Sequence, residues 1–250
     1  MISRLVLVVR STVFNILFFG FTTLALLGAM PLILISTRVV RWYSRQWARI
    51  VFALARGVAG ITWELRGHTE LLKPGTLVAC KHQSAWDTIV FVLLFDGPVY
   101  VMKKELGYIP IYGWLAKSQG HIFVDRKAGA SAIRNLRRQA QAALKAGRSI
   151  AIFPQGTRVA PRTPAPYQPG VAGLYSAAQA PVVPVALNSG LFWGRRKYLK
   201  HPGTILVEVL PEIPAGLDRE TFMRELGTRI ETATTRLENE TLALRASSYA

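Results

Sequence analysis

Cysteine and histidine are scarce in this chain of 250 residues. Its one cysteine, Cys80, excludes an intrachain disulfide framework and a metal site built from several cysteines. The four histidines, at positions 68, 82, 121 and 201, do not have the i, i+4 spacing of a zinc site on a helix. The sequence therefore implies no metal, and no cofactor is expected.

Acidic residues are also few. The chain has 14 Asp and Glu against 31 Lys and Arg, a formal net charge of +17, and its first acid is Glu64. Residues 1–207 hold six of the acids and 26 of the bases, so this part carries a charge of +20. A positive field of that size attracts nucleic acids, anionic lipid headgroups or phosphorylated small molecules, and charge alone does not choose among them.

One long hydrophobic run helps to separate these classes. Residues 11–37 are 27 consecutive uncharged residues, rich in Leu, Ile, Phe and Val and bounded by Arg10 and Arg38. A helix of this length reaches roughly 40 Å, which exceeds the roughly 30 Å hydrocarbon core of a bilayer. The run predicts an N-terminal membrane-embedded helical segment. A secretory signal peptide is the rival interpretation, although its apolar region would extend over only about 7 to 15 residues.

Residues that interrupt the run leave two arrangements in the membrane possible. Asn15, Gly20, Gly28 and Pro31 interrupt it, so two short helices that enter one leaflet compete with a single span. Both flanks are rich in arginine, and by the positive-inside rule either path leaves the rest of the chain in the cytoplasm. We therefore expect the protein at the cell (inner) membrane, with its downstream domain facing the cytoplasm.

The chain divides into residues 1–62, predicted as membrane-associated helices, and residues 63–250, predicted as an α/β domain. In the first part, residues 50–63 form a second apolar stretch that predicts an interfacial or core helix. In the second part, strands and helices alternate, which favours a mostly parallel sheet flanked by helices. Pro184 restricts its strand to an edge or a bulge. Strands are predicted at 76–80, 99–102, 121–124, 149–153, 182–187 and 205–209, and helices at 85–95, 128–146 and 218–237.

The sequence KHQSAWD at residues 81–87 places His82 five residues before Asp87. On an ideal helix five residues turn through about 500°, so the two side chains would point about 140° apart. They meet only if His82 lies in the turn before the helix, where Ser84 fits as the N-cap and Asp87 as the acidic half of a capping box. A histidine oriented by a carboxylate can act as a general base near neutral pH. The same residues also fit a plain helix start with no catalytic role.

Two further motifs end in an arginine that follows a predicted strand. FPQGTR at residues 153–158 places Arg158 after a glycine-containing turn, and such a loop exposes backbone N–H groups beside a planar guanidinium that matches phosphate. GHIFVDR at residues 120–126 ends in Arg126. FPQGTR therefore indicates phosphate binding, with a plain turn and a solvated arginine as the alternative, and GHIFVDR is a second strand that ends in an arginine.

Four motifs, in this order along the chain, resemble the PlsC family, the 1-acyl-sn-glycerol-3-phosphate acyltransferases, also called lysophosphatidic acid acyltransferases. The resemblance extends over about residues 63–214, and the apolar N-terminus is in keeping with it. The segments MKKEL and IPIYGW, which lie between the first two motifs, also resemble the family. The four motifs are residues 82–87, 120–126, 153–158 and 182–187.

The resemblance implies a membrane-associated enzyme with the glycerolipid acyltransferase fold. It would transfer a fatty acyl group from acyl-CoA or acyl-carrier protein to the sn-2 hydroxyl of 1-acyl-sn-glycerol-3-phosphate, giving phosphatidic acid in phospholipid biosynthesis. His82 would be the general base and Asp87 would orient it, with the acyl group passing directly to the acceptor. The implied partners are membrane lipid, the acyl donor and lysophosphatidate, with no nucleic acid. The acceptor's phosphate would be bound by Arg126, Gly156, Thr157 and Arg158, assisted by Lys103 or Lys104.

One position departs from the family pattern, because Gln155 stands where the family most often has Glu, and this puts an acid or base role there in doubt. Cys80 or Ser84 could instead carry the acyl group covalently, although Cys80 fits a core position and Ser84 fits a helix cap. Another lysolipid, such as one that contains an amino acid, is an alternative acceptor. A membrane-tethered nucleic-acid binder is the alternative outside the enzyme class, and we find none of the recognition motifs of such proteins.

Overall fold

The computed structural model describes residues 3–125 and 129–247, so Arg126 lies outside the described residues. The strands of the described part are β1 (Ile61–Gly67), β2 (Leu77–Cys80), β3 (Val99–Lys103), β4 (Ile122–Val124), β5 (Ile150–Ile152), β6 (Val182–Leu187) and β7 (Gly203–Val209). They form one sheet in the order β1-β7-β6-β2-β5-β3-β4. Neighbouring strands are parallel except for β6 and β7, which are antiparallel. The predicted α/β fold with a mostly parallel sheet is confirmed.

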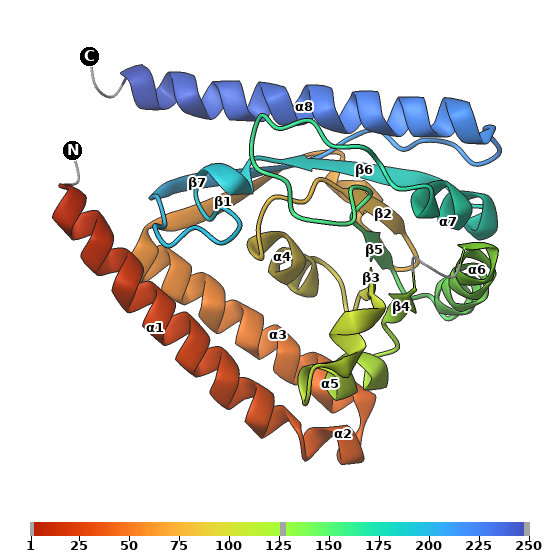
Figure 1. Cartoon of the computed structure of the whole chain (residues 1–250), viewed down its shortest axis with the longest axis horizontal. Helices are drawn as coiled ribbons and strands as arrows, with labels where there is room; N and C mark the ends of the chain where they lie inside the picture. The colour runs from red at the N-terminus through yellow and green to blue at the C-terminus, as the bar shows by residue number, and fades with distance from the viewer. Residues whose placement is uncertain (1–2, 126–128, 248–250) are drawn as a thin grey trace.

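Helices cover both faces of this sheet (Figure 1). The helices are α1 (Arg4–Ala29), α2 (Leu32–Ile35), α3 (Thr37–Leu54), α4 (Trp86–Leu94), α5 (Tyr112–Ser118), α6 (Gly129–Lys145), α7 (Gly170–Ala178) and α8 (Arg219–Ser247). Successive residues of a strand face opposite sides, and on β2 Val78 and Cys80 enter one apolar core while Leu77 and Ala79 enter another. Helices α1, α3 and α4 contribute to the first core, and α6, α7 and α8 to the second.

The two long N-terminal helices, α1 and α3, lie antiparallel along one side of the molecule, with the short α2 between them (Figure 1). Helix α1 passes through Asn15, Gly20 and Gly28 without a break, and the interruption comes at Pro31. The segment Arg4–Ile35 is long and apolar enough to cross a membrane, judged by length and composition. Only 11% of its most apolar window is buried, so most of this surface is free to contact lipid.

One face of α1 is attached to the α/β domain by polar contacts with the loop between β6 and β7. The backbone N–H of Lys200 donates to Ser11 Oγ (2.9 Å), and Asn15 Nδ2 donates to the carbonyl of Tyr198 (3.0 Å). The hydroxyl groups of Thr12 and Tyr198 are also hydrogen-bonded. These three side chains of α1 therefore face protein, while Leu5, Val9 and other apolar residues of the helix are exposed.

The helix predicted over residues 50–63 is wrong at its C-terminal end. Helix α3 ends at Leu54, a π-helical turn covers Ala55–Ala59, and β1 begins at Ile61. Gly60 separates the turn from the strand with a left-handed backbone (φ 69°), a conformation that favours glycine. The predicted division of the chain between residues 62 and 63 falls within β1, and it stays a prediction.

Pro184 was predicted to lie at an edge or a bulge, and the edge is excluded because β6 lies between β7 and β2 inside the sheet. The proline is accommodated where the pairing with the β7 side is irregular. Val185 pairs with Val209 and Val182 pairs with Ile213, so three steps along β6 correspond to four along its partner. This extra residue makes a bulge, which is the other placement that a strand proline allows.

Candidate active site

His82 lies in the turn between β2 and α4, and its side chain meets Asp87 in the first turn of that helix. The distance between His82 Nδ1 and Asp87 Oδ2 is 3.0 Å. Helix α4 begins only at Trp86, so His82 has the non-helical position that the five-residue spacing requires. The predicted N-cap is one residue off, since Ala85 is the N-cap. Ser84 Oγ instead accepts a hydrogen bond from the backbone N–H of Trp86 (3.1 Å).

Asp87 is fully buried, and both of its carboxylate oxygens have partners. Besides the His82 ring, Oδ2 accepts the backbone N–H groups of Gln83 (2.6 Å) and Ser84 (2.8 Å). The other oxygen, Oδ1, accepts the hydroxyl of Ser189 (2.5 Å). A carboxylate that is removed from water needs such donors to stay ionised. Because an ionised carboxylate can only accept, the proton of the His82 ring lies on Nδ1.

Ser189 is a site residue that the sequence analysis missed. It lies two residues after the end of β6, and β6 pairs with β2, the strand that leads to His82. Parallel neighbours bring their carboxyl ends to the same edge of a sheet, so Ser189 reaches Asp87 although 102 positions separate them in the chain. The signal that could have found it is the position itself, just after a buried strand.

The His82 ring is held on its other side as well. It stacks on the Phe153 ring, with centroids 4.0 Å apart and an interplanar angle of 22°. The carbonyl of His82 accepts the backbone N–H of Val159 (2.8 Å), which fixes the histidine to the end of the FPQGTR loop. With Nδ1 facing Asp87, Nε2 is the nitrogen left for a ligand, and it carries no proton when the ring is neutral.

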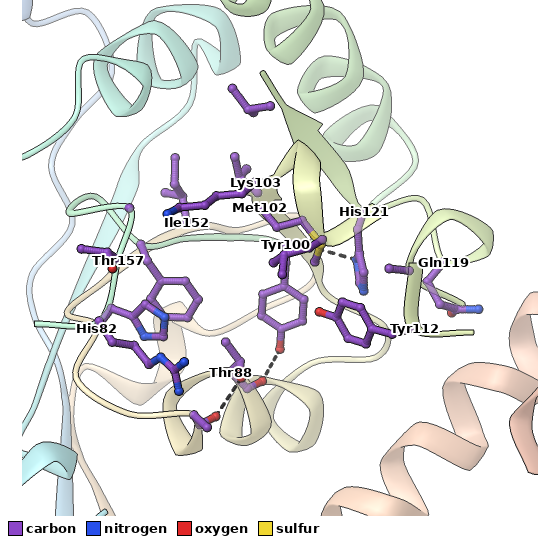
Figure 2. A pocket seen from close by; sticks show the side chains of 18 of the residues that line it. His82, Thr88, Tyr100, Met102, Lys103, Tyr112, Gln119, His121, Ile152 and Thr157 are labelled. Carbon is purple, nitrogen blue, oxygen red and sulfur yellow. Dashed lines mark hydrogen bonds between the residues drawn. The ribbon is translucent and has the colours of Figure 1, made fainter. Parts of the chain in front are cut away.

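A cavity of about 970 Å³ opens beside His82 (Figure 2). Residues of α1, α3, α4, β3, α5, α6 and the start of α7 line its walls. Many of these are apolar, including Leu26, Val40, Ile89 and Leu136. The N-terminal helices therefore border the same space as the histidine.

The structure brings most of the predicted phosphate-binding residues to this cavity. Lys103, Gly156, Thr157 and Arg158 line it together with His82. Lys104 is not among the lining residues, and its ammonium group is bound to Asp125 Oδ2 (3.1 Å). Arg126 falls in the part of the chain that the structure does not describe.

Two arginines that the sequence analysis missed, Arg195 and Arg196, also line the cavity. Arg195 donates to the backbone carbonyl of Arg158 (2.9 Å). Burial lowers the pKa of Arg158 from its usual value, and the nearby charge of Arg195 and then Arg196 lowers it too, against the opposing effect of Asp87. Among the described residues, none of the three arginines forms an ion pair with a carboxylate, so all three are available to an anion. The run GRRK at residues 194–197 was the signal in the sequence.

Gln155 points away from the cavity and toward α8. It is buried, and its Nε2 donates to Glu231 Oε1 (3.4 Å). The same carboxylate accepts Lys81 Nζ (2.6 and 2.8 Å) and the Tyr167 hydroxyl (2.9 Å). A glutamate at position 155 would bring a second carboxylate against Glu231, which gives a physical reason for the amide here.

Neither candidate for a covalent route borders the cavity. Cys80 is fully buried, and burial raises the pKa of its thiol well above the usual value, so the thiolate needed for attack is disfavoured. Ser84 is buried and its hydroxyl is occupied at the start of α4. In the described ranges, no three His, Cys, Asp or Glu side chains come together as metal ligands would.

Comparisons with known proteins find relatives of this chain. Residues 63–188 match the family model described as Acyltransferase. The 1-acyl-sn-glycerol-3-phosphate acyltransferase of Pseudomonas aeruginosa is 34% identical over 191 residues, which are 76% of this chain and 74% of that protein. The enzyme of the same name from Saccharomyces cerevisiae is 27% identical over 186 residues, which are 72% of this chain and 61% of that protein.

The fold is shared with a solved structure. The crystal structure of the 1-acyl-sn-glycerophosphate (LPA) acyltransferase, PlsC, from Thermotoga maritima is similar with a TM-score of 0.71, covering 92% of this chain and 98% of that chain at 15% sequence identity. The family model matches half of the chain, and the Pseudomonas relative is similar across about three quarters of both proteins. This chain therefore belongs to the acyltransferase family of the PlsC type.

Proposed function

We propose that this protein transfers a fatty acyl group from acyl-CoA or acyl-carrier protein to the sn-2 hydroxyl of 1-acyl-sn-glycerol-3-phosphate, giving phosphatidic acid for phospholipid biosynthesis. The observation that carries the proposal is the 3.0 Å contact between His82 and Asp87 on the wall of a cavity that Arg158 also lines. The similarity to relatives named as 1-acyl-sn-glycerol-3-phosphate acyltransferases supports the same substrate.

In the proposed reaction His82 acts as the general base. Its Nε2 takes the proton of the acceptor hydroxyl, and the hydroxyl oxygen attacks the carbonyl carbon of the thioester. Asp87 keeps the Nδ1 proton in place and stabilises the imidazolium that forms. The new C–O ester bond replaces the C–S bond, and the sulfur leaves as a thiol after the imidazolium returns the proton. No residue of the protein is acylated at any step.

The acceptor's phosphate is assigned to the part of the cavity that Arg158, Arg195 and Arg196 line. Gly156 shapes this loop, because its left-handed backbone (φ 65°) and the bond from its N–H to the Phe153 carbonyl (2.8 Å) close a tight turn. Thr157 and Arg158 follow that turn at the cavity wall, and Lys103 lies at the end of β3. Arg126 completes the proposed set. Lys104 contributes charge from outside the cavity.

For the membrane we favour a hairpin that enters one leaflet over a single span. One face of α1 is already bound to the α/β domain through Ser11 and Asn15, and a helix that crosses the bilayer next to this domain would have to give up those contacts. Leu34 and Ile35 of α2 are exposed and form the apolar tip of the hairpin. Both basic flanks, and with them the catalytic domain, then stay on the cytoplasmic side of the membrane.

The proposal is tested with the full-length protein in detergent, labelled acyl-CoA and a panel of acceptors. The panel contains 1-acyl-sn-glycerol-3-phosphate, the monoacylglycerol without phosphate, and an amino-acid-containing lysolipid. We expect product from the phosphate-bearing acceptor and a loss of about 10²- to 10⁴-fold in His82→Ala. His68 is the matched control, since it forms a histidine–carboxylate contact with Glu70 on the surface (3.2 Å), and His68→Ala should leave the rate unchanged.

Two results would contradict the proposal. Equal rates in the wild-type protein and His82→Ala would show that His82 is not the general base. Transfer to the amino-acid lysolipid in preference to the phosphate-bearing one would replace the acceptor while leaving the acyltransferase chemistry in place.

A further inference from the structure

The cavity has a second polar region that the proposed reaction does not use. It is formed by Tyr112, Gln119 and His121, all of which come from α5 and the segment that joins α5 to β4. Figure 2 shows His82 on one side of Tyr100 and these three side chains on the other. Tyr100 therefore separates this region of the cavity from His82 (Figure 2), and an acyl chain that extends past Tyr100 would reach it.

Gln119 is the least satisfied of the three. Its exposed fraction is 9%, and neither its Oε1 nor its Nε2 has a hydrogen-bond partner among the described residues. A buried primary amide without partners is disfavoured, and in folded proteins such groups are nearly always paired with protein, water or a ligand. Because Gln119 lines the cavity, the missing partner has to come from whatever occupies that space.

His121 supplies a donor at the same place. Its Nδ1 accepts the backbone N–H of Tyr100 (3.3 Å), so the proton of the neutral ring is on Nε2. Burial, and to a smaller extent the charge of Arg148, lowers the pKa of His121 to about 4, so the ring is neutral at physiological pH. The Tyr112 hydroxyl makes no hydrogen bond within the described part of the chain, and burial raises its pKa, so it keeps its proton.

We propose that Tyr112, Gln119 and His121 form a subsite for an uncharged oxygen-bearing group, such as a hydroxyl, on an acyl chain bound in the cavity. The inference rests on the proposed function, because it takes the cavity as the place of the acyl chains. A hydroxyl both donates and accepts, and the three side chains offer an amide oxygen together with N–H and O–H donors. No cation is among them, whereas a phosphate has Arg158 and Lys103 at the other part of the cavity. Leu115, Ala116 and Met102 line the cavity around the subsite and suit the hydrocarbon on either side of the hydroxyl.

The test compares hexadecanoyl-CoA with a set of hydroxyhexadecanoyl-CoAs that carry the hydroxyl at successive positions. At the position that reaches the subsite, we expect kcat/KM to exceed that of the plain chain by about 3- to 10-fold, the size of one or two net hydrogen bonds. A second arm uses plain donor with hydroxylated 1-acyl-sn-glycerol-3-phosphate, because the chain of the acceptor is the other source of the same group. The arm in which the preference appears identifies the chain.

Gln119→Leu is the decisive variant, and it should abolish the preference, so that the hydroxylated and plain donors are used with equal kcat/KM. Tyr112→Phe removes one hydroxyl only, and we expect it to reduce the preference partly. Gln141→Leu is the matched control, since Gln141 Nε2 already donates to the Ala177 carbonyl (2.8 Å) and the residue does not line the cavity. The unfolding temperature shows whether the variant is folded. Without ligand, Gln119→Leu should unfold at the same temperature as the wild-type protein or at a higher one.

The failures of the two proposals are distinguishable. If no donor is used at all, the proposed function fails, and the subsite is then judged by whether a hydroxylated acyl-CoA raises the unfolding temperature more than hexadecanoyl-CoA does. If transfer is observed but no hydroxyl position is preferred in either arm, or if Gln119→Leu retains the preference, the subsite is wrong and the acyltransferase proposal stands.

Discussion

Two histidines border the same cavity in opposite tautomers. His82 faces the carboxylate of Asp87 with its Nδ1, so that nitrogen carries the proton and Nε2 is a bare acceptor. His121 receives the backbone N–H of Tyr100 at Nδ1, so its proton is on Nε2 and the ring presents a donor. The comparison teaches that the group at Nδ1 decides the role of the ring. A ring with its proton on Nδ1 can take a proton from a substrate at Nε2, whereas a ring with its proton on Nε2 can only donate a hydrogen bond there.

The largest effect is expected from changing the partner of His82. In Asp87→Asn the amide no longer requires a proton on Nδ1, and the base is no longer held in its acceptor tautomer. We expect kcat to fall by about 10³- to 10⁴-fold with residual transfer remaining. Asp218→Asn is the control, because Asp218 accepts backbone N–H groups at the start of α8, outside the cavity. Undiminished turnover in Asp87→Asn would mean that the carboxylate does not set the tautomer.

The second prediction uses the pH dependence that His121 imposes on stability. Its pKa is lowered to about 4 in the folded protein, so between about pH 6.5 and pH 4 the unfolded chain binds the proton and the folded one does not. Stability therefore falls as the pH drops through this window, by about 2 to 3 kcal/mol from this one group. Urea unfolding at pH 7 and pH 4.5 should show a smaller loss in His121→Asn than in the wild-type protein. His68→Asn, at an exposed histidine, is the control and should lose as much stability between pH 7 and pH 4.5 as the wild-type protein. An equal loss in the wild-type protein and His121→Asn would refute the prediction.

A smaller effect is expected at Ser189, which holds the oxygen of Asp87 that does not touch His82. Ser189→Ala leaves Oδ1 without its donor, and we expect kcat to fall about tenfold with KM nearly unchanged, since one hydrogen bond to a charged group is lost. Ser189→Thr keeps the hydroxyl and should restore much of the rate. Ser149→Ala is the control, because it removes a buried serine hydroxyl that donates to the Lys73 carbonyl and does not contact Asp87. It shows how much of the effect on kcat comes from the loss of a buried hydrogen bond alone. A change in KM alone would assign Ser189 to substrate binding instead.

The smallest effect concerns how many carboxylates the buried contact between Gln155 and α8 tolerates. Gln155→Glu brings a second carboxylate to within hydrogen-bonding distance of Glu231, and we expect a loss of about 1 kcal/mol in the free energy of unfolding at pH 7. The double change with Glu231→Gln should recover most of that loss, as measured by the urea midpoint. Additive losses in the double variant would exclude repulsion as the cause.

The sequence was sufficient for the features that are local. The contact of His82 with Asp87 follows from a five-residue spacing and the geometry of one turn. The strand at Val182–Leu187 was predicted with its observed bounds, because a near-continuous apolar run marks a buried parallel strand. Arg158 was proposed from its glycine-containing turn and Lys103 from the family resemblance, and both line the cavity.

The remaining features depend on packing that no local pattern records. Helix α7 has the sequence GVAGLYSAA and is buried along most of its length, so it shows no polar face and was not predicted. Helix α5 is shorter still, with 7 residues, and α8 continues to Ser247 beyond the predicted end at residue 237. Ser189 and Arg195 reach the site from segments more than 100 positions after His82 in the chain, through a strand order that the sequence analysis left open.

The place of β1 in the sheet has a consequence for how the protein is made. Within the described residues this strand lies at the edge of the sheet and pairs with β7 alone, about 140 residues later in the chain. At a synthesis rate of roughly 5 to 20 residues per second, the ribosome needs about 7 to 28 s to produce that partner. The N-terminal helices are therefore complete while β1 still lacks its partner. Until β7 is made, the chain carries both an exposed apolar hairpin and an open strand edge, and each of these is available for aggregation.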